Sequence, residues 1–111
     1  MIIKYSREFL PMTYSRSELS VLINEFINEN ESFSFKQICS FIFNRANLEG
    51  RLRKEKDTQY QGGIEISYSD ETIISQTLWK LIHEKKIFIN FSTNPYCTHR
   101  NEVEFHRAIA D

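Results

Sequence analysis

The sequence predicts a single α+β domain in which three helices precede a β-hairpin. Two Ser-x-x-Glu/Gln capping boxes, at Ser15 and Ser34, each stand directly before apolar residues at helical spacing. A third helical run leads directly into an alternating apolar segment, 87–91, and a second such segment follows at 102–106. The chain has three glycines and two prolines, so we expect most of it to form regular structure.

The length and composition agree with one ordinary globular domain. With 111 residues, 41% hydrophobic and 26% charged, the chain can bury a core without metals or disulfides. The apolar runs are shorter than the ~18 residues of a membrane span. Charges at Lys4, Arg7 and Glu8 interrupt the start, so we expect no membrane segment and no signal peptide. Two cysteines, Cys39 and Cys97, make no disulfide framework, and the expected location is the cytoplasm.

The two capping boxes begin the first two helices. The first helix is predicted over 16–29, with an apolar face of Leu19, Leu22, Ile23, Phe26 and Ile27. The second is predicted near 35–47, with an apolar face of Phe35, Ile38, Cys39, Ile42, Phe43 and Ala46. Phe33, which stands between them, could staple the entry of the second helix or form a short strand.

The third helix and the hairpin follow without a break. Ser69 or Asp70 is the predicted cap of a helix over about 70–85, with one side made of Ile73, Ile74, Thr77, Leu78, Leu81 and Ile82. Lys85 and Lys86 fall in its last turn, where positive charge suits the helix dipole. A strand over 87–91, a loop over 92–101 and a returning strand over 102–106 complete the hairpin.

Two segments lie outside this plan. Residues 1–14 form an N-terminal extension, in which Ile2, Ile3 and Tyr5 could pair as a strand or dock on a partner. Residues 49–68 form an insertion between the second and third helices. Its polar part, 49–63, is typical of a solvated loop, and 64–68 alternates weakly as a strand.

The arrangement of elements over about residues 15–107 resembles the winged helix-turn-helix superfamily. The resemblance is strongest at 77–91, where a helix runs directly into a hairpin strand. It implies that the third helix is a recognition helix and that the hairpin is the wing. A helix-turn-helix joins its second and third helices by ~3–4 residues. Here the 49–68 segment intervenes, which indicates either an insertion in a winged helix or another α+β arrangement.

The resemblance implies a small sequence-specific DNA-binding transcriptional regulator, which we expect to bind double-stranded DNA as a homodimer. One side of the third helix would enter the major groove with Thr72, Ser75, Gln76, Trp79, Lys80 and His83. Two further groups would contact phosphates. The wing tip would use His99 and Arg100, and the basic stretch between the second and third helices would use Arg51, Arg53, Lys54 and Lys56. The third-helix set and the wing tip are equally typical of a solvated surface, and a charge run such as 51–56 is more often simply solvated.

The near-zero net charge hides two blocks of opposite sign. Residues 17–35 contain Glu18, Glu25, Glu29 and Glu31 with no lysine or arginine. Residues 36–56 contain six basic against two acidic residues. A net charge of −1 and a pI near 6.3 count against nucleic-acid binding. A domain that is acidic behind and basic in front would still attract a polyanion, so the net charge decides nothing by itself.

The alternative function is a protein-interaction adaptor or inhibitor, of the kind found in phages or mobile elements. Trp79 lies near the middle of the polar side of the third helix. It is therefore either covered by another segment or subunit, or exposed as an anchor for a protein partner. The acidic face from Glu18 to Glu31 is a second possible contact surface for such a partner.

An enzyme is not expected. The sequence has no P-loop, no glycine-rich dinucleotide turn and no Gly-x-Ser-x-Gly motif. Cys97 and His99 with Cys39 and His106 are a weak metal set, because structural zinc sites show paired ligands at tight spacing. Neighbouring Cys97 and His99 are equally poor candidates for a nucleophile and its base. We predict neither a metal nor a cofactor.

Overall fold

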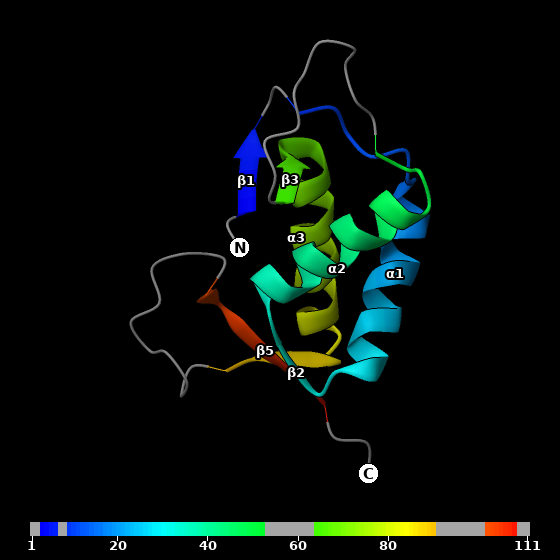
Figure 1. Cartoon of the computed structure of the whole chain (residues 1–111). Helices are drawn as coiled ribbons and strands as arrows, with labels where there is room; N and C mark the ends of the chain where they lie inside the picture. The colour runs from blue at the N-terminus through cyan, green and yellow to red at the C-terminus, as the bar shows by residue number, and fades with distance from the viewer. Residues whose placement is uncertain (1–2, 7–8, 53–63, 91–101, 109–111) are drawn as a thin grey trace.

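A computed structural model of the chain describes residues 3–6, 9–52, 64–90 and 102–108 (Figure 1). Its elements, in chain order, are β1 (Ile3–Ser6), α1 (Arg16–Glu29), β2 (Ser32–Ser34), α2 (Phe35–Leu48), β3 (Ile64–Ser67), α3 (Tyr68–His83), β4 (Ile87–Ile89) and β5 (Glu104–Arg107). The predicted α+β class and its three helices are confirmed.

Both predicted capping boxes form. The Ser15 hydroxyl oxygen accepts the Glu18 backbone N–H at 3.1 Å, and the Glu18 carboxylate accepts the Ser15 N–H at 3.0 Å. Ser34 and Gln37 repeat this exchange at 3.1 and 2.8 Å. These contacts satisfy amides that a helix start otherwise leaves unpaired. Helices α1 and α2 therefore begin where the sequence predicts.

The cap of α3 lies earlier than predicted. Ser67, and not Ser69 or Asp70, is the N-cap residue, and its hydroxyl oxygen accepts the Asp70 N–H at 3.1 Å. Asp70 accepts the Ser67 hydroxyl at 3.0 Å and the Met12 N–H at 2.8 Å. At the other end α3 stops at His83, so Lys85 lies beyond the helix, with a φ of 62°.

A three-stranded antiparallel sheet has the order β2-β5-β4. Phe33 of β2 and Ile89 of β4 both stand opposite Phe105 of β5, so one apolar row crosses the sheet. The Phe33 and Phe105 rings stack with centroids 5.4 Å apart. Phe33 therefore belongs to a strand, the second of its two predicted roles. The strand β5 begins and ends later than the predicted 102–106.

A separate two-stranded sheet pairs β1 with β3 in parallel, with Ile3 opposite Ile64 and Tyr5 opposite Ile66. The two sheets lie at opposite ends of α3, because β3 leads into this helix and β4 follows it (Figure 1). The strand alternatives for the N-terminal extension and for the end of the 49–68 insertion are thus confirmed. Strands β1 and β3 both contact α3.

The core consists of side chains from the predicted apolar helix faces and from all five described strands, and the segment before α1 adds Met12 and Tyr14. Each fully buried aliphatic side chain contributes roughly 1.5–3 kcal/mol to stability. Helix α3 buries Ile74, Leu78 and Leu81, which leaves its opposite side at the surface. In the described ranges, no helix is long and apolar enough to cross a membrane.

Candidate functional site

The outward side of α3 carries most of the residues that the sequence singles out. Its exposed members, at positions i, i+4, i+7, i+8 and i+11, are Thr72, Gln76, Trp79, Lys80 and His83. We call this set the α3 surface. Ser75 lies half-buried at its edge, and its hydroxyl donates to the Glu71 carboxylate at 3.0 Å. Five of the six predicted residues thus share one exposed stripe, because they fall within about 100° around the helix axis.

No exposed carboxylate lies on α3, a helix that the structure describes in full. The two acidic residues of this helix, Asp70 and Glu71, are 2% and 7% exposed and lie in its first turn. Carboxylates in a first turn are favoured by the helix dipole. Lys80 and His83, in contrast, are exposed in the last turn. The surface of α3 therefore offers hydroxyl, amide and basic groups to a partner.

Arg16 adds a guanidinium donor to this stripe from another element. It is the first residue of α1, and its Nη1 donates to Gln76 Oε1 at 2.9 Å. Both side chains are exposed. The contact joins residues 60 positions apart in sequence, and no local pattern in the sequence indicates it. Arg16 is the residue that the sequence-based candidate set misses.

Trp79 is 64% exposed, so the exposed alternative describes this residue. It borders a cavity of about 240 Å³ between α3 and the three-stranded sheet. The cavity is lined by Phe35, Ser75, Leu78, Trp79, Ile82, Ile89, Val103 and Phe105. Seven of these eight side chains are apolar, so the α3 surface borders an apolar cavity at Trp79.

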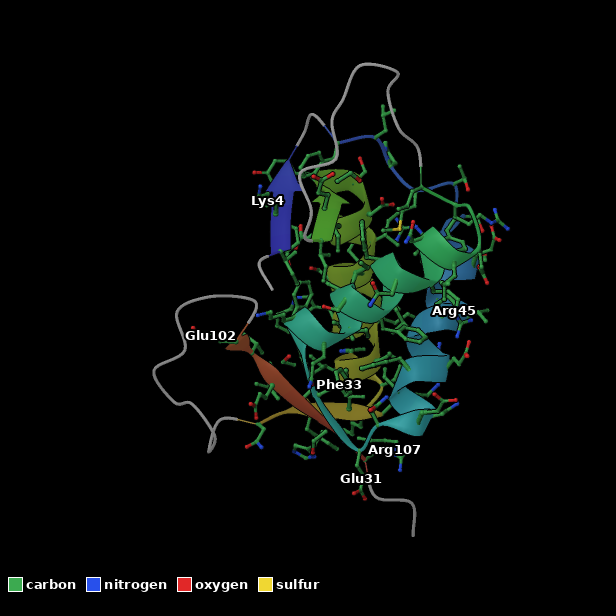
Figure 2. All side chains as sticks on the ribbon, viewed as in Figure 1. Lys4, Glu31, Phe33, Arg45, Glu102 and Arg107 are labelled. Atoms are coloured by element: carbon green, nitrogen blue, oxygen red, sulfur yellow. The ribbon has the colours of Figure 1, made fainter. Side chains whose placement is uncertain are left out.

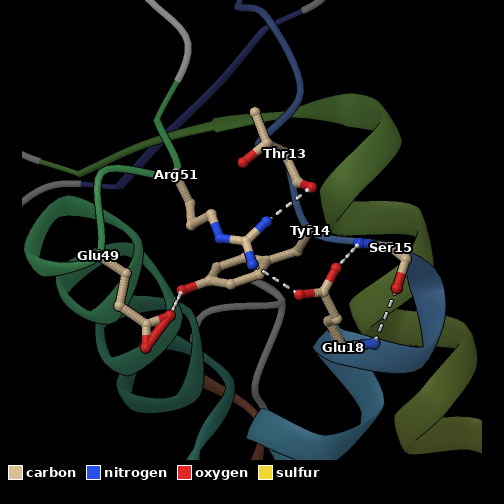
Figure 3. A network of polar contacts seen from close by, with 6 residues as sticks. All are labelled: Thr13, Tyr14, Ser15, Glu18, Glu49 and Arg51. Atoms are coloured by element: carbon tan, nitrogen blue, oxygen red, sulfur yellow. Dashed lines mark hydrogen bonds and ion pairs between the residues drawn. The ribbon is translucent and has the colours of Figure 1, made fainter.

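The candidate phosphate contacts divide into one described and five undescribed residues. Arg53, Lys54, Lys56, His99 and Arg100 lie outside the described ranges. Arg51 is half-buried, and Figure 3 shows its guanidinium among Thr13, Tyr14 and Glu18. It donates to Glu18 Oε2 at 2.9 Å and to the Thr13 carbonyl at 3.4 Å, and lies 5.1 Å from the Tyr14 ring centre. The Arg51 charge is therefore engaged inside the domain.

Arg51 and Gln76 also lie on different sides of α1. Arg16, which contacts Gln76, and Glu18, which contacts Arg51, are two positions apart on this helix. Two positions correspond to about 200° around the helix axis. Arg51 is thus separated from the α3 surface by the first turn of α1. Arg51 and Lys80 therefore do not form one continuous basic surface.

The two charge blocks of the sequence meet instead of separating. Glu25 of α1 pairs with Arg45 in the second half of α2, at 2.9 Å. Glu18 of α1 pairs with Arg51, just beyond the end of α2, also at 2.9 Å. Figure 2 shows Arg45 beside α1, where it donates to Glu25. The hydrogen bond with Glu25 raises the pKa of Arg45. At these two positions the acidic and basic blocks are not on separate faces, because opposite charges neutralise one another at the contact.

Tyr14 extends this contact to the N-terminal extension. Its hydroxyl donates to the Glu49 carboxylate just beyond α2, and burial and the Glu49 charge raise the pKa of Tyr14 to about 12 (Figure 3). The Ser15 N–H lowers the pKa of Glu18, with a further contribution from Arg51. These bonds hold residues 13–15 against the end of α2. We interpret this network as structural.

The residues considered for metal binding do not converge where they are described. Cys39 is buried in α2, where the Tyr5 hydroxyl lies 3.8 Å from its sulfur. His106 lies on β5 and stacks on Phe88 of β4. Cys97 and His99 lie outside the described ranges. Among the residues that the structure does describe, no three His, Cys, Asp or Glu side chains are grouped to hold a metal ion.

On the α3 surface, exposed hydrogen-bonding and basic side chains from two elements, α3 and the start of α1, meet. Such groups are the ones that contact base edges and phosphates. Helix α3 also forms one wall of the apolar cavity. The chain matches no protein-family model, no curated protein and no solved structure.

Proposed function

We propose that this chain is a winged-helix DNA-binding domain, with α3 as the recognition helix and β4 and β5 as the wing. The order of elements supports this, since three helices precede two antiparallel strands and α3 is followed directly by β4. The strand β2 extends these two strands into a sheet. In this proposal β1 and β3 are additions from the extension and the insertion, packed at the far end of α3.

One observation carries the proposed function: α3 exposes hydrogen-bond donors and basic groups while both of its carboxylates are buried. The major groove, about 12 Å wide, admits an α-helix. From Thr72 to His83 the α3 surface is about 16 Å long at 1.5 Å per residue. Thr72 and Gln76 are suited to base edges, and Lys80 and His83 to phosphates.

The net charge of −1 is compatible with this role. Of the fifteen acidic residues, Glu18 and Glu25 are neutralised in ion pairs, and Asp70 and Glu71 are buried. These four carboxylates do not face a partner that approaches α3. A polyanion responds to the local potential of the surface that it approaches more than to the net charge.

The test is a selection from random DNA duplexes at low salt, followed by affinity measurements over a range of salt concentrations. Lys80→Gln should weaken binding to every selected duplex and reduce the salt slope by about one. Arg45→Gln is the matched control, because it removes one positive charge at the α1–α2 contact, away from α3. Failure to select any duplex, or equal effects of the two variants, would contradict the proposal.

A protein-binding function is the second candidate, because the exposed Trp79 borders an apolar cavity. Exposed aromatic residues beside apolar pockets are typical anchors of protein interfaces. Trp79→Ala separates the two candidates. It should abolish binding of a protein partner and leave DNA affinity unchanged if this second function is correct. Loss of DNA affinity in the variant would favour the first.

A further inference from the structure

The contact between Arg16 and Gln76 determines what Gln76 can offer to a partner. Arg16 Nη1 lies 2.9 Å from Gln76 Oε1. A guanidinium carries N–H donors and no acceptor, so the amide group of Gln76 must direct its oxygen, and not its nitrogen, to Arg16. This removes the usual ambiguity between the two ends of a glutamine amide.

The paired side chains present donors to an approaching ligand. Gln76 keeps both N–H groups of its amide nitrogen, and Arg16 keeps the N–H groups that do not contact Gln76. The Gln76 oxygen retains a second lone pair. The positive charge beside this oxygen disfavours the approach of a further N–H donor. The pair therefore differs from an isolated glutamine, which offers one donor and one acceptor side by side.

This difference changes the base that Gln76 would select. An isolated glutamine reads adenine, because it donates to N7 and accepts from the N6 amino group. Guanine presents two acceptors, N7 and O6, in the same groove. A surface that offers only donors is complementary to the two acceptors of guanine. At adenine the same surface meets the N6 amino group, which is itself a donor and so forms no hydrogen bond with it. The adenine contact that an isolated glutamine makes therefore does not apply to Gln76 while it is paired with Arg16.

We infer that Arg16 and Gln76 form one reading unit that selects guanine over adenine at one position of the DNA site. The inference rests on the proposed DNA-binding function and deepens it, since it assigns the base read by the middle of α3. It also places a specificity residue on α1, outside the recognition helix. Arg16 is the first residue of α1, whose backbone is fixed by the Ser15 and Glu18 capping box.

The test is a double-mutant cycle on the selected duplex. Binding of the wild type, Arg16→Ala, Gln76→Ala and the double variant is measured on duplexes in which each guanine is replaced in turn by adenine, with the paired base changed to match. At one position the wild type should prefer guanine by about tenfold or more. Each single variant should reduce that preference, and the double variant should reduce it no further than the stronger single variant does.

Arg16→Lys separates base reading from simple charge. Lysine keeps the positive charge but lacks the planar fork of the guanidinium. It should restore overall affinity relative to Arg16→Ala, and restore the guanine preference less than the affinity. Circular dichroism of each variant checks that the fold is retained.

Two results would overturn the inference and leave the proposed function intact. One is a uniform loss of affinity in Arg16→Ala on all duplexes, with a smaller salt slope, which indicates a phosphate contact. The other is an adenine preference that depends on Gln76 and not on Arg16. If Lys80→Gln and Arg45→Gln behave alike, or if no duplex is selected, the proposed function fails and the inference fails with it.

Discussion

Arg107 Nη1 lies 2.7 Å from the carbonyl oxygen of Asn28, so a side chain of β5 closes the C-terminal end of α1. The same nitrogen donates to the Ile27 carbonyl at 3.2 Å. Figure 2 shows Arg107 beside this end of the helix. Helix α1 has no basic residue in its own last turn. A cation supplied by β5 therefore satisfies carbonyls that a helix end leaves unpaired and opposes the helix dipole.

Arg107→Ala should lower the free energy of unfolding by about 1–2 kcal/mol, because it removes a charged donor from two carbonyls and a cation from the dipole. The measurement is the urea midpoint of unfolding. Lys36→Ala, an exposed basic residue on α2, is the control and should change stability by less than about 0.5 kcal/mol. Equal effects of the two changes would show that the carbonyl contacts contribute nothing.

Lys85→Gly should stabilise the domain by about 0.5–1 kcal/mol. Lys85 has a φ of 62°, in the left-handed region that disfavours a side chain. Its N–H donates to the Ile82 carbonyl and the Lys86 N–H donates to the Leu81 carbonyl, which is a common way for a helix to end. Lys85→Ala keeps a Cβ atom and should give no such gain. A gain in both variants would assign the effect to lost charge.

Stability should fall as the pH rises from about 10 to about 12, in part because of Tyr14. The pKa of Tyr14 is raised from 10.0 to about 12, so in this window the unfolded chain loses the phenol proton and the folded chain keeps it. The folded state then binds more protons than the unfolded state, and stability decreases with pH. The stability of Tyr14→Phe should not show this part of the decrease with pH. Identical pH dependence in both proteins, measured by urea unfolding, would contradict the assigned pKa.

Phe33→Ala should destabilise the domain by about 3–5 kcal/mol. The Phe33 side chain is 3% exposed and its ring contacts the rings of Phe105 and Phe26, with centroids 5.4 and 5.5 Å away. Its loss leaves a cavity between α1 and the three-stranded sheet. Phe88→Ala, on the other face of that sheet and 40% exposed, is the comparison and should cost much less. Similar losses would mean that β2 does not hold Phe33 in the core.

The elements that the sequence predicts well are those with local signals. Ser15 and Ser34 are each followed three residues later by the Glu or Gln of a capping box, so the starts of α1 and α2 are marked locally. At α3 three candidate caps stand within four residues. The choice of Ser67 depends on Asp70, whose carboxylate is needed by the Met12 N–H, 58 positions away. A cap that is selected by a distant contact leaves no local pattern.

The candidate site is predictable only in part, because only some of its features have a local signal in the sequence. The exposed side of α3 follows from helical spacing and the burial of Ile74, Leu78 and Leu81. The position of Arg51 and the contact of Arg16 with Gln76 depend on which sides of α1 meet α2 and α3. Charge counts along the sequence contain no information about that packing. The acidic and basic blocks therefore suggest two separate charged faces, whereas in the fold Glu18 and Glu25 pair with Arg51 and Arg45.

The exposure of Trp79 determines which optical signal can follow this protein. Trp79 is the single tryptophan of the chain, and 64% of it already faces water in the folded state. Its emission should therefore change little when the domain unfolds in urea, in contrast to the usual case of a core tryptophan. The same emission should respond strongly when a ligand covers α3. Intrinsic fluorescence thus reports occupancy of this helix, while folding must be followed by circular dichroism.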